Sequence, residues 1–98
     1  MKHNGKEIKI FYMPFPGCGS IGGALFDNGE NYLIFINNLR TPLLQRQAIG
    51  HELAHLFLGH ELQPISEYLN NGKELRDMEK EANRQAWHYY RQYRDNRL

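Results

Sequence analysis

Apolar residues gather in three short segments within the first third of the chain. Residues 8–13 are rich in β-branched and aromatic side chains and stop before Pro14, which is typical of a strand that ends at a proline. Residues 22–26 and 32–36 flank the turn sequence Asp27-Asn28-Gly29-Glu30, whose Asn-Gly pair can supply the positive φ angles that hairpin turns need. The pattern predicts a small antiparallel sheet that consists of one strand and a β-hairpin.

The rest of the chain carries apolar residues at spacings of three and four, which is typical of amphipathic helices. Thr41 and Pro42 predict a helix start, because a hydroxyl caps the first turn and proline fits its first position. This helix is expected over residues 42–58, where the following glycine ends it. After a connection over residues 60–72, a second long helix is expected over residues 73–93.

Each helix has a candidate core stripe. In the first helix the stripe is Leu44, Ile49, Leu53, Leu56 and Phe57. In the second helix it is Leu75, Met78, Ala82, Ala86, Tyr89 and Tyr93. A small antiparallel sheet followed by two long helices, in a chain of 98 residues, indicates one α+β domain over residues 1–98.

Composition narrows the classes of function. The net charge of +1 argues against a dedicated nucleic-acid or membrane-surface binder. The single cysteine, Cys18, cannot form an internal disulfide, which fits a reducing compartment and excludes a zinc site built on cysteines. No apolar run has the form of a signal peptide or a transmembrane helix, so a cytoplasmic protein is expected.

The candidate chemistry lies in the first predicted helix, in the sequence His51-Glu52-Leu53-Ala54-His55. Residues four apart share one face of a helix, so the two imidazoles can both reach one zinc ion. Glu52 follows the first histidine and is placed to accept a proton from water that the metal activates. This arrangement is the zinc site of peptidases that use glutamate as a general base.

A catalytic zinc needs a third protein ligand and an open fourth position. A third histidine at position 61 would indicate a metzincin, but that position is Glu61. His60 is the nearest other histidine and lies off the face of the motif. A carboxylate from the second helix is the better candidate, and Glu79 and Glu81 both qualify.

Two motifs resemble the ImmA/IrrE family of metallopeptidases. Residues 47–60 read QAIGHELAHLFLGH, and residues 79–86 read EKEANRQA, similar to the family's E-x-E-A-N-x-F-A helix. Gln85 stands where the family usually has phenylalanine. The resemblance also includes the order of strand, hairpin and two helices, and so covers most of the chain. It implies a zincin-like minimal domain with Glu81 as the third zinc ligand.

The resemblance further implies a peptidase that cleaves transcriptional repressors, often in phage, mobile-element or stress regulons. No helix-turn-helix or other DNA-binding segment is recognisable in the chain, so the expected partner is a separately encoded repressor. We therefore predict a zinc metallo-endopeptidase. His51, His55 and Glu81 are its expected ligands, and Glu52 is its expected general base and acid.

Several alternatives stay open at this point. One is a non-catalytic metal-binding or protein-interaction module, against which the intact Glu52 argues, since a structural site needs no base. Another is nucleic-acid binding by the arginines and aromatic residues of the second helix, which read more simply as a solvated basic face. His88 and Tyr68 are candidates for contacting substrate or an oxyanion. The strand over residues 32–36 can be either an edge for an extended peptide or a central strand.

Overall fold

The computed structural model describes residues 1–17, 21–59 and 72–96. Residues 60–71 of the predicted connection, which include His60 and Tyr68, lie outside the described residues, as does Cys18. Within the described residues, no helix has both the length and the apolar character needed to cross a membrane.

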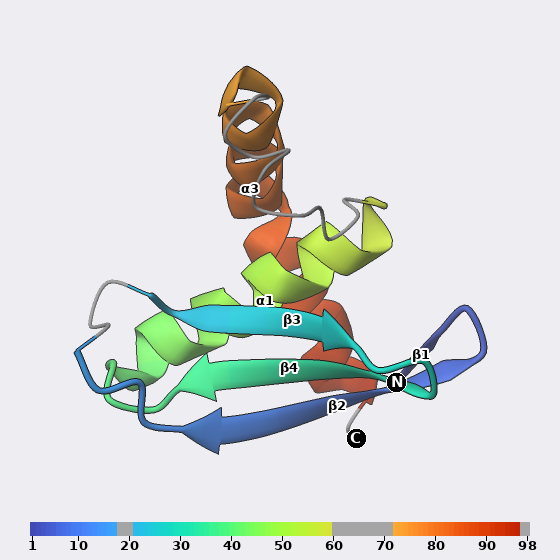
Figure 1. The fold of residues 1–98 in the computed structure, drawn as a ribbon, viewed down its shortest axis with the longest axis horizontal. Helices are drawn as coiled ribbons and strands as arrows, with labels where there is room; N and C mark the ends of the chain where they lie inside the picture. The colour runs from blue at the N-terminus through green and yellow to red at the C-terminus, as the bar shows by residue number, and fades with distance from the viewer. Residues whose placement is uncertain (18–20, 60–71, 97–98) are drawn as a thin grey trace.

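The four strands form one sheet (Figure 1). They are β1 (Lys2–His3), β2 (Lys6–Met13), β3 (Gly23–Asp27) and β4 (Asn31–Asn37), in the spatial order β1-β2-β4-β3. The hairpin of β3 and β4 is confirmed, because Leu25 pairs with Ile34 in antiparallel register. The α+β class is confirmed as well.

The sheet is mixed, whereas the sequence pattern predicted an antiparallel one. β2 pairs with β4 in parallel, with Ile10 opposite Ile34, and β4 therefore lies between β2 and β3. The physical reason is that β4 is apolar on both faces: Ile34 and Ile36 are fully buried, and the intervening Phe35 is half-buried. Such a strand buries most surface when it is paired on both sides. β4 is therefore central, and β3 forms an edge of the sheet.

The helix α1 spans Pro42–Phe57, close to the predicted range. The hydroxyl of Thr41 accepts a hydrogen bond from the backbone N–H of Leu44 at 3.4 Å, as expected for an N-cap. Leu58 is the C-cap, and Gly59 follows with a φ of 74°, the left-handed conformation that commonly follows a helix. The second long helix, α3, spans Gly72–Asn96.

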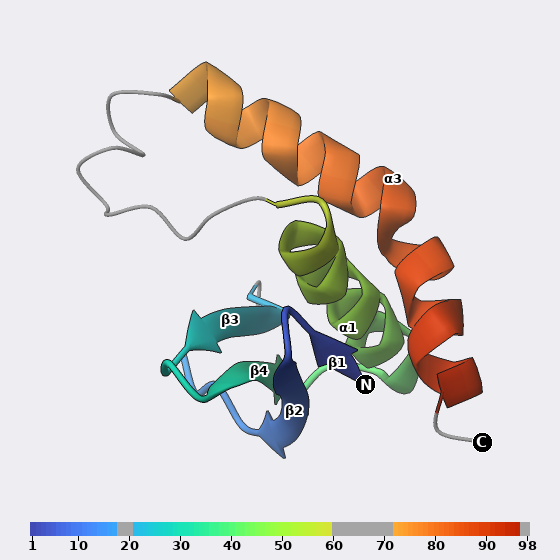
Figure 2. The same cartoon turned by 90° about the vertical axis from the view of Figure 1, so that its right-hand side faces the viewer.

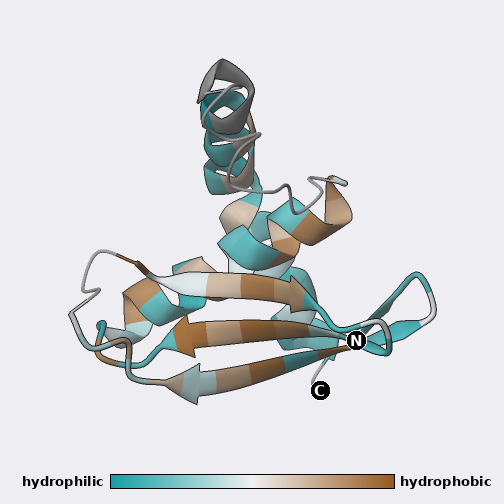
Figure 3. Cartoon of the chain, viewed as in Figure 1, coloured by the Kyte–Doolittle hydropathy of each residue, from teal (hydrophilic) through white to brown (hydrophobic). Residues whose placement is uncertain are grey.

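The domain has three layers, in the order sheet, α1 and α3 (Figure 2). The strands are rich in apolar residues, whereas the visible part of α3 is largely hydrophilic (Figure 3). The core between the sheet and α1 consists of Ile8, Leu25, Tyr32, Ile34, Ile36, Ala48, Ile49 and Leu53. Ala82 and Ala86 of α3 are fully buried, so the predicted stripe of this helix is confirmed at its centre.

The two helices approach very closely at Gly50. A methyl group added at Gly50 would lie 1.8 Å from the carbonyl oxygen of Ala86 and 2.6 Å from its carbonyl carbon. These distances are far inside van der Waals contact, so only glycine allows the two backbones to lie this close. The contact places the middle of α3 beside the residue that precedes His51.

Candidate metal centre

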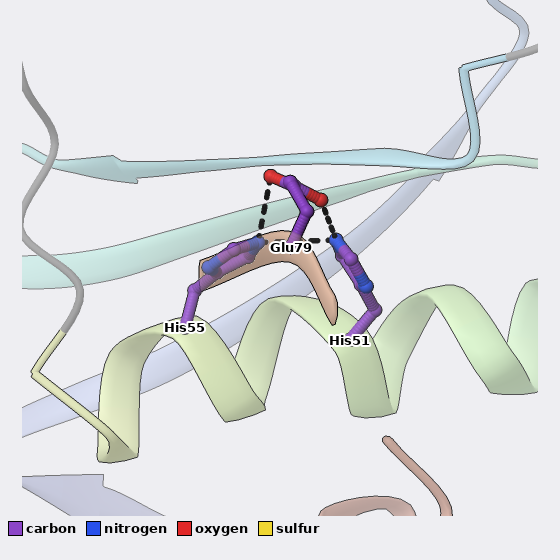
Figure 4. A group of neighbouring side chains, drawn as sticks. All are labelled: His51, His55 and Glu79. Atoms are coloured by element: carbon purple, nitrogen blue, oxygen red, sulfur yellow. Dashed lines mark hydrogen bonds and ion pairs between the residues drawn. The ribbon is translucent and has the colours of Figure 1, made fainter. Parts of the chain in front are cut away.

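Three potential metal ligands converge between α1 and α3 (Figure 4). His51 and His55 stand one turn apart on α1, and their Nε2 atoms are 3.0 Å from each other. From α3, the carboxylate of Glu79 reaches both rings: one oxygen lies 2.9 Å from Nε2 of His51, and the other 3.2 Å from Nε2 of His55. The two histidines are four residues apart, and both imidazoles lie on one face of α1, as the sequence predicted.

Asn83 orients the first of these rings. Its side-chain oxygen lies 2.8 Å from Nδ1 of His51. An amide oxygen only accepts hydrogen bonds, so Nδ1 of His51 carries a proton and donates it. A neutral His51 then presents a lone pair at Nε2 toward the Glu79 carboxylate, and two acceptors 2.9 Å apart need a cation between them. A proton or a metal ion can fill that role.

The charged groups of the site shift one another's pKa values. Burial lowers the pKa of His51, but its hydrogen bond with Glu79 and the nearby charge of Glu52 outweigh this, and the pKa is raised overall. The hydrogen bonds from His51 and His55 lower the pKa of Glu79 well below its usual range. Glu79 is therefore an anion at neutral pH, and the pair of imidazoles faces a permanent negative charge.

Glu52 lies against the edge strand β3. A methyl group on Gly23 would come within 3.3 Å of Cγ of Glu52, so the missing side chain of this glycine leaves room for the glutamate. Burial raises the pKa of Glu52, while the charges of His51 and His55 oppose this rise. A half-buried carboxyl with a raised pKa beside two imidazoles has the properties that proton transfer near neutral pH requires.

The three side chains fit a zinc ion. Imidazole nitrogen and carboxylate oxygen are both zinc ligands, and at bond lengths of about 2.0–2.2 Å tetrahedral ligands lie roughly 3.4 Å apart. The two Nε2 atoms are 3.0 Å apart and one Glu79 oxygen lies 2.9 Å from Nε2 of His51, so a small outward shift of these atoms would admit the ion, while the other Glu79 oxygen lies 3.2 Å from Nε2 of His55. The contact between Asn83 and His51 supplies the outer hydrogen bond that metal-binding histidines usually make.

The third member of this cluster is Glu79, whereas the resemblance implied Glu81. Glu81 is half-buried and lies elsewhere on α3, where it lines an open hollow of about 490 Å³ together with Asp77, Lys80, Asn83 and Arg84. The two glutamates are two residues apart, so they point about 200° away from each other around the helix axis. The rotation of α3 that buries Ala82 and Ala86 against α1 brings Glu79 to the histidines.

The other predicted candidates lie outside the cluster or outside the described residues. His88 is exposed, and its Nε2 lies 3.0 Å from the side-chain nitrogen of Gln92 on the same helix. Gln85 is also exposed, so the family's usual phenylalanine position takes no part in packing α3 against α1. Arg84, Arg91 and Arg94 are exposed as well, as expected for a solvated face.

Sequence reasoning missed the roles of Asn83, Gly50 and Gly23. A signal for the first was present: Asn83 follows Glu79 by four residues, so both share one face of α3. The i, i+4 pair of Glu79 and Asn83 faces the i, i+4 pair of His51 and His55. No comparable signal marks the two glycines, because their importance depends on which backbone or side chain approaches them.

Two packed helices thus present two imidazoles and a carboxylate at one point, with a second carboxylate beside them, and this group could hold a metal ion. The sequence profile described as the IrrE N-terminal-like domain, of the M78 peptidases, matches residues 4–91. The chain therefore belongs to the ImmA/IrrE family, and this membership indicates a metallopeptidase-type role with protein substrates. No curated protein and no solved structure gave a significant match.

Proposed function

We propose that the protein is a zinc-dependent endopeptidase, with His51, His55 and Glu79 as ligands and Glu52 as general base and acid. The observation that carries the proposal is the convergence of the three ligand groups within 4.8 Å of one another, beside the half-buried Glu52. Bound there, zinc would polarise the peptide carbonyl and make water more acidic. This choice of ligands replaces Glu81 by Glu79 on the strength of the contacts.

Glu52 and Asn83 have separate roles in the proposed reaction. A carboxylate oxygen of Glu52 takes the proton from the attacking water and later delivers it to the leaving amine nitrogen. The raised pKa of Glu52 makes its carboxylate a stronger base for the first of these steps. Asn83 holds the ring of His51 in the tautomer whose Nε2 faces the ion.

The edge strand β3 is the best place for an extended substrate. β4 pairs with one side of β3, and Gly23 brings the backbone of β3 against Glu52. An extended peptide can add to a sheet edge through backbone hydrogen bonds, which need no particular side chains. The sequence left the edge role open for residues 32–36. In the structure that strand is central, so the proposal moves this role to β3.

The metal proposal predicts that protein purified without chelator carries about one zinc per chain. An ion that binds only the native state stabilises it by about 2.7 kcal/mol at one hundred times the Kd. For a domain of this size, that corresponds to a Tm difference of roughly 10–20 °C between zinc-loaded and chelator-treated protein. Elemental analysis and a thermal scan measure both quantities. Protein with no metal content and no affinity on titration would end the metalloenzyme proposal.

Zinc affinities of two matched variants identify which glutamate is the third ligand. Glu79→Ala is expected to weaken zinc affinity by at least about 10-fold, the scale seen even when an outer partner of a ligand is lost. Glu81→Ala removes the same group two residues away and is expected to leave the affinity near that of the wild type. Competition with a chelating dye gives both constants. If Glu81→Ala strips the metal while Glu79→Ala keeps it, the ligand is the one that the resemblance implied.

The substrate that we propose is a separately encoded DNA-binding repressor, of the kind associated with phage and mobile elements. This step rests on family resemblance, because fold and site do not specify a protein partner. Co-expression with repressors encoded beside the gene is expected to yield a discrete cleavage product, detected by intact mass. The Glu52→Gln variant serves as the control. Repressors that stay intact with the wild type would remove this partner and leave the peptidase chemistry to be tested on other substrates.

A further inference from the structure

An arginine that no sequence motif identified lies next to the proposed substrate edge. Arg40 precedes α1, and its guanidinium lies against Gly22, the residue before β3. A methyl group on Gly22 would lie 2.8 Å from Nη1 of Arg40 and 3.2 Å from Cβ of Ala48. Glycine at this position therefore leaves the space that the guanidinium occupies. The next residue, Gly23, does the same for Glu52.

The buried amide of Asn37 fixes the backbone on both sides of this contact. Asn37 is fully buried, its backbone N–H donates to the carbonyl of Gly22 at 2.9 Å, and its side chain donates to the carbonyl of Ile21 at 3.0 Å. On the other side, the backbone N–H of Arg40 donates to the carbonyl of Asn37 at 3.4 Å. A single polar residue thus connects the start of β3 to the segment that carries Arg40.

The positive charge of Arg40 has no local counterpart. Among residues 1–17, 21–59 and 72–96, no acceptor is hydrogen-bonded or ion-paired to its guanidinium, although the side chain is half-buried. The first turn of α1, which begins two residues later, contains no acidic residue. The N-terminal end of a helix carries partial positive charge, so it adds to the potential around Arg40. The planar fork of N–H donors on this guanidinium therefore has no partner among the described residues.

We infer that Arg40 is a specificity-determining residue that binds a carboxylate of the peptide lying along β3. The inference rests on the proposed peptidase function and gives the substrate a chemical feature. Arginine binds a carboxylate through two parallel hydrogen bonds, which fix its position as well as its charge. Arg40 lies against the residue before β3 and Glu52 against the first residue of β3, and an extended peptide advances about 3.3 Å per residue. The acidic group therefore lies within about one to three residues of the cleaved bond.

The test uses the zinc-loaded Glu52→Gln protein, which retains a peptide without cutting it. A pool of random peptides is synthesised in two forms, with a free or an amidated C-terminus, and the bound fraction is sequenced by mass spectrometry. We expect enrichment of Asp and Glu at one position in both forms if the carboxylate is a side chain. Preferential binding of the free form over the amidated form, without such an enrichment, would indicate the C-terminal carboxylate.

Adding Arg40→Gln is expected to reduce this enrichment about 10-fold, since the amide keeps part of the stem and loses the charge-assisted pair. Arg40→Glu is expected to replace the preference for Asp and Glu by a preference for Lys and Arg at the same position. Arg46→Gln, which changes an exposed arginine on α1, is the matched control and keeps the acidic preference. Equal Tm values for the variants exclude misfolding as the cause.

Two results would overturn the inference: a bound pool that prefers neither Asp and Glu nor a free C-terminus, or a preference that Arg40→Gln leaves unchanged. Failure of the peptidase proposal has a different signature. If the selected peptides depend on Arg40 for binding, and zinc-loaded wild-type protein cuts none of them, the carboxylate site stands and the hydrolytic function falls.

Discussion

Glu52→Gln is expected to keep the zinc and to lose peptide hydrolysis by about 10²- to 10⁴-fold, the usual contribution of general acid–base catalysis. The amide has nearly the shape of the carboxyl and can occupy the same space against Gly23, so the fold and the three ligands stay in place. It cannot take a proton from water or give one to the leaving amine. Zinc content by elemental analysis and initial rates on a cleaved peptide measure the two halves of this prediction.

Glu30→Gln is a suitable control, because this glutamate is exposed in the turn between β3 and β4, outside the ligand cluster. It is expected to cleave at the wild-type rate. Hydrolysis at the wild-type rate by Glu52→Gln would show that Glu52 is not the base. A wild-type protein that binds a repressor tightly and cuts nothing would favour the non-catalytic binding module instead.

Gly50→Ala is expected to destabilise the fold by about 3 kcal/mol, which places it at the upper end of the usual cost of overpacking. Alanine is the better helix former by about 1 kcal/mol, so an isolated α1 would gain stability from this change. In the domain, however, the new methyl group meets the backbone of Ala86 at 1.8 Å. Backbone cannot rotate away as a side chain can, so the two helices must move apart.

The same change is expected to weaken zinc affinity, because it moves α3, which carries Glu79, away from the histidines of α1. Thermal unfolding and zinc titration of Gly50→Ala and of Arg46→Ala measure both effects. Arg46 is exposed on the same helix, and its substitution is expected to change stability by less than about 0.5 kcal/mol. A Gly50→Ala protein as stable as the wild type would mean that α1 and α3 do not cross at this point.

Local signals predicted the secondary structure well. Thr41 and Pro42 place the start of α1, and the turn sequence around Gly29 places the hairpin. These features depend on a few neighbouring residues, so sequence alone contains them. The parallel pairing of β2 with β4 depends instead on which strand gains most from being central. The continuous apolar run of β4 was a signal for a central strand, but which strand pairs with its second side depends on the packing of the whole sheet.

The same distinction holds for the site. That His51 and His55 share one face of α1 follows from the period of a single helix. Whether Glu79 or Glu81 approaches them depends on how α3 is rotated against α1. The buried centre of the apolar stripe favours Glu79, because this residue lies about 20° from Ala86 around the helix axis, whereas Glu81 lies about 140° from it. The pairing of Glu79 with Asn83 across one helical turn would have favoured the observed side.

The layered arrangement also determines how a bound ion would leave. The core cluster is formed by strands and α1 alone, while α3 packs against that assembly through Ala82, Ala86 and its tyrosines. Local openings of a protein need free energies that range up to that of global unfolding, and the close packing of α3 along α1 makes this opening a costly one. When α3 lifts away, the carboxylate separates from both imidazoles while the sheet and α1 stay folded. The residence time of the metal is then set by the docking of one helix, and the rate of metal exchange reports how often that helix opens.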